Sequence, residues 1–272
     1  MKLKLTVVRW IILCPLVSLA PSCLFAQKTE ADIGARLLKK SLFLRGQWSN
    51  DKLAFDGAGL LMKVTSGPTS FTLSGVDIAS VKLTPIGLVL SGQRMGLEFK
   101  KDVPKRVGLL LSESSSREDV TIKIQTPADG DFTTALDAIF TDSIANLDLR
   151  LPWCWQQYAY EHLFPAGTPA KTGGIPHPVS HSRGTSVPRL TKEVDPTFSA
   201  AARALDYSGV VLVNLIIGKD GIPAHIRILH AAGLGLDELA VAAVSQYVFE
   251  PATEFGAPVE VELNIEVNFQ GL

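Results

Sequence analysis

The sequence contains little cysteine, with three in 272 residues. Cys14 and Cys23 lie in the apolar N-terminal stretch, so Cys154 is alone in the rest of the chain. This count excludes an internal disulfide once the N-terminal stretch is removed. Cys154 stands between Trp153 and Trp155 and has no basic neighbour to activate its thiol. We therefore interpret it as a small packing residue.

Motifs of the common enzyme classes are also missing. The sequence has no P-loop, no H-E-x-x-H, no G-x-S-x-G and no C-x-x-C. Asp220 is explained by a turn, and Asp237 with Glu238 by the start of a helix. His225 and His230 are interpreted as strand residues. We therefore predict a protein that is not an enzyme and that binds no cofactor, no metal and no nucleic acid.

The N-terminus has the pattern of an export signal. A basic start precedes an apolar stretch over residues 10–20, and the small residue Ala26 follows. This pattern predicts a signal peptide over residues 1–26, cleaved after Ala26. Two alternatives stay open, an uncleaved signal anchor in the inner membrane and a lipid attached to Cys23. All three place the body of the protein outside the cytoplasm, in the periplasm of a diderm cell.

The next part, residues 28–164, is predicted to be a mainly-β envelope domain of unknown function. Short apolar runs between residues 60 and 124 alternate with Gly and Pro, which favours a small barrel or a curved sheet with helices. An apolar stripe over 131–147 predicts a helix. We interpret the aromatic stretch 151–164 as packing that closes this domain, with a ligand-stacking platform as the alternative. Residues 165–192, rich in Pro, Gly and Ser, are predicted to be a linker.

Charge is distributed unevenly along the chain. Residues 28–106 hold 13 Lys and Arg against 7 Asp and Glu, whereas residues 196–272 hold 3 against 9. The first part is therefore basic by about six charges and the last part acidic by about six. A basic domain suits anionic lipid head groups or peptidoglycan, and the alternative is an ordinary solvated surface.

The last part, residues 193–272, reads as an α+β module. The apolar spacing predicts an antiparallel sheet of about three strands with two helices. The helices are expected over 197–205 and 236–247, and the strands over 209–217, 222–231 and 258–269. Asp220-Gly221 is a hairpin signal between the first two strands.

The final strand alternates between apolar and polar residues. Its apolar side holds Val259, Val261, Leu263, Ile265, Val267 and Phe269. Its polar side holds Glu260, Glu262, Asn264, Glu266 and Asn268. Such alternation is typical of a half-buried strand with one face in water. A last strand is often a sheet edge, whose unpaired backbone groups can bind the strand of another chain.

Several short runs of this module, in order, resemble the C-terminal domain of the energy transducer TonB family. They are Asp195-Pro-Thr-Phe198, Gly209-Val-Val-Leu-Val213, Gly218-Lys-Asp-Gly221, Leu236-Asp-Glu-Leu-Ala-Val-Ala-Ala-Val244, Phe249-Glu-Pro-Ala252, Gly256-Ala-Pro-Val259 and Val267-Asn-Phe269. The resemblance covers about 75 residues.

This resemblance implies a fold and a mechanism. Members of the family are anchored in the inner membrane next to motor proteins of the ExbB/ExbD type, and their C-terminal domain captures a peptide of an outer-membrane receptor as an added strand. The docking strand it implies here consists of Val259, Glu260, Val261, Glu262, Leu263, Asn264, Ile265, Glu266, Val267 and Asn268. The open alternatives are a soluble periplasmic adaptor and a lipid- or peptidoglycan-binding protein, both without force transduction. An open edge also leaves room for a homodimer by strand exchange.

Overall fold

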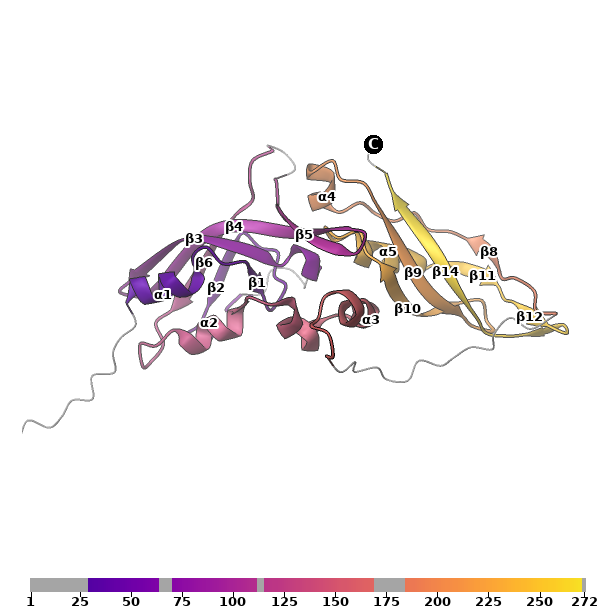
Figure 1. Ribbon diagram of the computed structural model, residues 1–272, viewed down its shortest axis with the longest axis horizontal. Coiled ribbons are helices and arrows are strands. Elements are labelled where there is room, and N and C mark those ends of the chain that lie inside the picture. The colour runs from indigo at the N-terminus through magenta and orange to yellow at the C-terminus, as the bar shows by residue number, and fades with distance from the viewer. Residues whose placement is uncertain (1–28, 64–69, 112–114, 169–183, 271–272) are drawn as a thin grey trace, which may run out of the picture.

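The computed structural model describes residues 29–63, 70–111, 115–168 and 184–270. The predicted signal over 1–26 and the middle of the predicted linker, 169–183, lie outside the described residues. Residues 29–168 form one half of an elongated molecule and residues 184–270 the other (Figure 1).

The first half combines short helices with strands of two to fourteen residues. Its elements are α1 (Glu30–Leu37), β1 (Leu42–Leu44), β2 (Lys52–Phe55), η1 (Phe71–Leu73), β3 (Gly75–Thr84), β4 (Gly87–Lys100), β5 (Val103–Gly108), β6 (Asp119–Gln125), α2 (Thr133–Ile139), β7 (Phe140–Thr141), η2 (Ile144–Arg150) and α3 (Trp153–His162). Thr29 begins α1 with a capping box, because its hydroxyl accepts from the Asp32 amide and the Asp32 side chain accepts from the Thr29 amide.

The strands form one seven-stranded sheet in the order β2-β6-β4-β3-β1-β7, with β5 paired to β4. The neighbours are antiparallel except β2 and β6, which are parallel. β2 and β7 are the ends of this order and do not pair with each other, so the sheet is open in the described residues. Of the two predicted alternatives, the small barrel is therefore not observed; the described residues form an open sheet with helices.

The helices of this half cover the sheet with apolar side chains. Ile33 and Leu37 of α1 and Leu136 and Ile139 of α2 are buried in one core with the strand residues. The strand members of that core include Phe55, Val76, Leu88, Leu90, Ile122 and Ile124. Burial of an apolar helix face against a sheet is the main stabilising term for such short helices.

The second half is built around a smaller sheet. Its elements are β8 (Arg189–Lys192), α4 (Ala200–Ala204), β9 (Gly209–Ile217), β10 (Pro223–His230), α5 (Leu236–Val244), β11 (Val248–Glu250), β12 (Thr253–Glu254), β13 (Ala257–Pro258) and β14 (Val261–Phe269). The main sheet has three antiparallel strands in the order β10-β9-β14, and two small ladders, β8–β11 and β12–β13, accompany it. The final strand begins at Val261 rather than Pro258, since Pro258 pairs with Thr253 in the β12–β13 ladder.

The predicted linker over 165–192 is shorter than the sequence suggested. Its last residues belong to the second half, because β8 pairs with β11 and Arg189 forms an ion pair of 2.7 Å with Glu250. The Ser186 amide also donates to the Thr253 carbonyl at 2.8 Å. These partners lie more than 55 residues further along the chain, so local composition could not predict the pairing.

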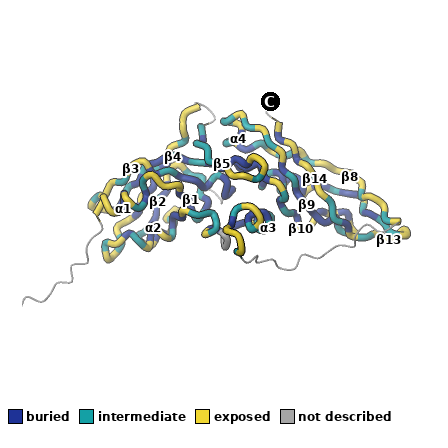
Figure 2. The backbone as a smooth tube through the Cα atoms, viewed as in Figure 1, coloured by how far each residue is buried: buried dark blue, intermediate teal, exposed yellow. Residues whose placement is uncertain are grey.

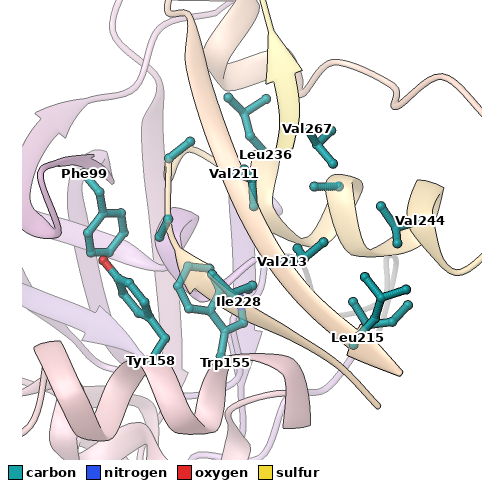
Figure 3. Close-up of a cluster of buried hydrophobic side chains, with 14 of the residues drawn as sticks. Phe99, Trp155, Tyr158, Val211, Val213, Leu215, Ile228, Leu236, Val244 and Val267 are labelled. Carbon is teal, nitrogen blue, oxygen red and sulfur yellow. The ribbon is translucent and has the colours of Figure 1, made fainter. Parts of the chain in front are cut away.

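Besides the core of the first half, a second hydrophobic core contains residues of both halves. Figure 2 colours the buried residues of both halves dark blue. This second core contains residues of the first sheet, of α3 and of the second sheet, and Figure 3 shows part of it. Trp155 and Tyr158 of α3 are fully buried there, next to Phe99 of β4 and Ile228 of β10. The aromatic stretch 151–164 therefore packs as expected, but it joins both halves instead of closing only the first.

Candidate partner-strand site

β14 lies at an edge of the second sheet. It pairs with β9 over its whole length, from Val261 opposite Ile217 to Phe269 opposite Gly209. The strand order ends at β14, so its other side carries no strand in the described part of the chain. In a strand, the backbone groups of alternate residues point to opposite sides. About half of the backbone groups of β14 are therefore directed toward the open side.

At the opposite end of the strand order, β10 and the chain that follows it contact the first half of the molecule. The Phe99 amide donates to the Ala232 carbonyl at 2.9 Å, and the Leu234 amide donates to the Leu97 carbonyl at 2.8 Å. The chain just after β10 is thus paired with the end of β4. Gly233 makes this approach possible, since it has φ +89° and a Cβ there would lie 2.2 Å from the Leu97 carbonyl oxygen. The module therefore contacts the first half on its β10 side, and β14 is the other end of the strand order.

The two faces of β14 differ as the alternation predicted. Val261, Val267 and Phe269 are buried in the core, whereas Leu263 and Ile265 are only half-buried. The polar residues Glu260, Asn264, Glu266 and Asn268 are exposed, and Val259 and Glu262 are half-buried. The middle of the strand therefore still offers apolar surface on its core side, which a further strand would cover.

A row of polar side chains crosses the outer face of the sheet. Arg227, Asn214 and Asn264 lie opposite one another on β10, β9 and β14. Arg227 Nε donates to Asn214 Oδ1 at 2.7 Å, and Asn214 Nδ2 donates to Asn264 Oδ1 at 2.7 Å. Arg227 also forms an ion pair of 2.6 Å with Glu262. Asn264 and Glu262 were expected on this face; Asn214 and Arg227 were not, although a lone Asn within the apolar run of β9 was a signal.

Buried acids hold the loop that pairs with β4. Asp237 is fully buried at the start of α5, and its two carboxylate oxygens accept from the amides of Ala232 and Gly233 at 2.8 Å each. Glu238 Oε1 accepts from Trp155 Nε1 at 2.8 Å. Burial, with Glu238 alongside, raises the pKa of Asp237 to about 7, and burial also raises the pKa of Glu238. These acids begin a helix as predicted, and they also fix the contact between the two halves.

A second polar contact lies at the same boundary. Asp102, in the turn between β4 and β5, accepts from the Tyr158 hydroxyl at 3.1 Å and lies 2.8 Å from His230 Nδ1. Burial raises the pKa of the Tyr158 hydroxyl, and the nearby Asp102 carboxylate raises it further. His225 lies at the bulge of β10, with its ring 5.8 Å from that of Trp153. Both histidines are thus in or at the end of the predicted strand, and no group of three potential metal ligands occurs among the described residues.

Cys154 lies in α3, partly buried. Burial, with Glu238 nearby, raises the pKa of its thiol to about 12. The thiol is therefore protonated at neutral pH, which agrees with a packing role.

The first half has a pocket of about 220 Å³ between α1, β1 and the α2–β7 region. Its cationic lining is Arg36, Lys40 and Arg45. Arg36 forms an ion pair with Asp137, and Arg45 donates to the backbone carbonyls of Asp137 and Asn146 at 2.8 Å each. Two of its three cations are thus already engaged within the protein, and the pocket does not define a lipid or polymer site.

Taken together, the second half is an α+β module whose three-stranded sheet contacts the first half next to β10 and ends at β14, where another strand could be added. Residues 194–270 match the family model of the Gram-negative bacterial TonB protein C-terminal. This segment of the chain therefore belongs to the TonB C-terminal domain family, as the resemblance predicted. That family belongs to TonB-dependent transport in the cell envelope and is generally associated with receptor interaction.

Comparison with solved structures gives a related match. The solution NMR structure of the Pseudomonas aeruginosa TonB C-terminal domain is 21% identical, with a TM-score of 0.27, and the match covers 35% of this chain and 94% of that chain. No curated protein matches the chain significantly. Within the described residues, none of the helices has the length and apolar character needed to cross a membrane.

Proposed function

We propose that the protein acts in TonB-dependent transport by docking a strand from an outer-membrane receptor on β14. The observation that carries this proposal is the nine-residue β14, which pairs only with β9 in the described residues and lies at the end of the strand order away from the contact with β4. An added strand would pair with the backbone groups of Val261–Asn268 that face away from β9 and cover the half-exposed Leu263 and Ile265. The Val259 amide is already engaged, because it donates to the Ala252 carbonyl at 2.9 Å. Binding of this kind requires no catalytic residue and no cofactor.

Energy transduction is the second part of the proposal. It requires the segment over 1–26 to stay in the inner membrane beside motor proteins of the ExbB/ExbD type. A docked strand is held by a row of backbone hydrogen bonds, so a pull along the strand is shared among several bonds. The module would transmit that pull through the common core to the first half.

The predicted cleavage after Ala26 supports a second candidate, a soluble periplasmic adaptor, because a cleaved chain has no membrane segment through which force could be transmitted. N-terminal sequencing after membrane fractionation distinguishes the candidates. An intact Met1 in the inner membrane favours the transducer, whereas a soluble chain that starts at Gln27 favours the adaptor.

Site-specific cross-linking in a diderm bacterium tests the docking itself. A photo-reactive amino acid is placed at Glu266, exposed on β14, and in a control protein at Lys123, exposed on β6. We expect an adduct with an outer-membrane receptor from position 266 and not from position 123. Equal adducts from both positions, or none from position 266, would exclude the proposed docking strand.

A further inference from the structure

The outer face of β14 also indicates which partner strand it accepts. We propose that this strand is an extended peptide with a basic residue opposite Glu266 and a hydrogen-bond acceptor opposite Asn264, separated by an apolar residue. This inference rests on the proposed function, because it concerns the chemistry of the strand that docks on β14.

The polar row fixes the orientation of the Asn264 side chain. A guanidinium group only donates, so the atom of Asn214 that faces Arg227 must be its oxygen. The amide nitrogen of Asn214 then donates to the oxygen of Asn264. This leaves Asn264 Nδ2, a donor, turned away from β9 on the exposed edge strand. A partner side chain opposite Asn264 is therefore favoured when it can accept a hydrogen bond, as Thr, Gln or Asn can.

Charge distinguishes the two glutamates that flank Asn264. The negative charge of Glu262 is compensated, because its carboxylate forms an ion pair of 2.6 Å with Arg227. Glu266 is exposed, and no cation of the described residues lies within ion-pair distance of it. Residues 196–272 carry 3 Lys and Arg against 9 Asp and Glu, so the surrounding field is also negative. Side chains directly opposite on paired strands have Cβ atoms about 5 Å apart, close enough for Lys or Arg of a partner to neutralise Glu266.

The pleat of the paired strands determines which residues of the partner strand face the core. Alternate residues of the partner point to the same side as Leu263 and Ile265. Both are half-buried and packed against the core, so apolar residues at those positions extend it. The recognised pattern is thus alternating, with apolar residues on one side and acceptor and basic residues on the other.

The test uses three synthetic nine-residue fluorescent peptides that alternate Val with Lys, Val with Thr or Val with Glu. Because each repeats every two residues, it presents the same pattern in every register that keeps Val on the core side. We measure binding to the full chain by fluorescence anisotropy at low salt. The expected order of affinity is Lys, then Thr, then Glu, with Kd about tenfold lower for the Lys peptide than for the Glu peptide.

Variants assign this order to particular residues. Glu266→Lys is expected to narrow or reverse the preference between the Lys and Glu peptides. Glu161→Lys, which makes the same charge change at an exposed position on α3, is expected to leave the order unchanged. Asn264→Asp removes the donor and adds a negative charge, so it should strengthen binding of the Lys peptide and weaken binding of the Glu peptide, whose carboxylates only accept.

Hydrogen exchange of β14 separates failure of this inference from failure of the proposed function. If all three peptides protect β14 equally and Glu266→Lys changes nothing, the inference is wrong although docking stands. If no peptide binds and no β14 amide is protected, both are wrong. If the order holds equally in Glu266→Lys, the charge of the whole module sets the preference, and the assignment to Glu266 is overturned.

Discussion

Replacing Trp155 with phenylalanine is predicted to destabilise both halves of the molecule together. Trp155 is fully buried, its ring centroid lies 4.5 Å from that of Phe71 of the first half, and its Nε1 donates to Glu238 of the second half at 2.8 Å. Phenylalanine keeps the aromatic contact but removes the donor. The change therefore affects the contact that connects α3 to α5.

The magnitude follows from two terms. A buried acceptor that loses its donor costs about 1–3 kcal/mol, and the smaller ring leaves a cavity that costs about 1 kcal/mol more. The free energy of unfolding should fall by about 2–4 kcal/mol. A chain of this size changes its Tm by about 2–4 °C per kcal/mol, so Tm should fall by roughly 5–15 °C.

Thermal unfolding followed by circular dichroism, with hydrogen exchange to resolve the two halves, measures this effect. Trp153→Phe is the matched control, since Trp153 lies in the same helix but is 44% exposed, and its change should stay within about 0.5 kcal/mol. The expected result for Trp155→Phe is one transition at lower temperature, with faster exchange in both sheets. Two separate transitions, of which only one moves, would refute a common core.

Three further predictions concern the boundary and the outer face. Gly233→Ala places a Cβ 2.2 Å from a carbonyl oxygen of β4 and should cost about 2–4 kcal/mol in urea unfolding. Because the pKa of Asp237 is raised to about 7, the folded state holds a proton that the unfolded chain releases near pH 4. The free energy of unfolding should therefore fall as pH rises from about 4 through about 7. Glu238→Gln should reduce this fall, which urea titrations at several pH values measure. Asn214→Ala interrupts the polar row beside Arg227 and should lower the urea midpoint by an amount equivalent to about 1–3 kcal/mol.

Local patterns in the sequence predicted some elements of the second half, whereas β8, β11, β12 and β13 were not predicted. The alternation over 258–269 predicted a half-buried strand, and β14 occupies Val261–Phe269 with alternating burial. Asp220-Gly221 predicted the hairpin between β9 and β10, and Gly221 there has φ +78°. These features depend on residues close together in the chain, so a single sequence carries them.

Long-range pairing could not be predicted in the same way. Leu97 and Leu234 are 137 positions apart, and nothing in their local sequence shows that the chain after β10 pairs with β4. For the same reason the sequence did not indicate which side of the second sheet contacts the first half. The parallel pairing of β2 with β6, and the addition of β8 to β11, also join segments that are distant in sequence. A pattern of short strands specifies that a sheet forms, but not whether its ends meet.

The candidate site was predicted in part for a similar reason. The ten residues of the docking strand came from alternation and from the family resemblance. Asn214 and Arg227 on the neighbouring strands orient Asn264 only through the register across β10, β9 and β14. This register depends on the bulge in β10 around His225, a residue with φ +52°. The hydrophobic pattern of the sequence does not predict that bulge.

Hydrogen–deuterium exchange of the full chain tests the central claim most directly. Exchange is measured with and without the receptor segment identified by cross-linking at Glu266. The account predicts slower exchange at alternate amides of β14, those not bonded to β9, with β10 unchanged. Protection confined to the first half, with β14 exchanging at its original rate, would contradict it.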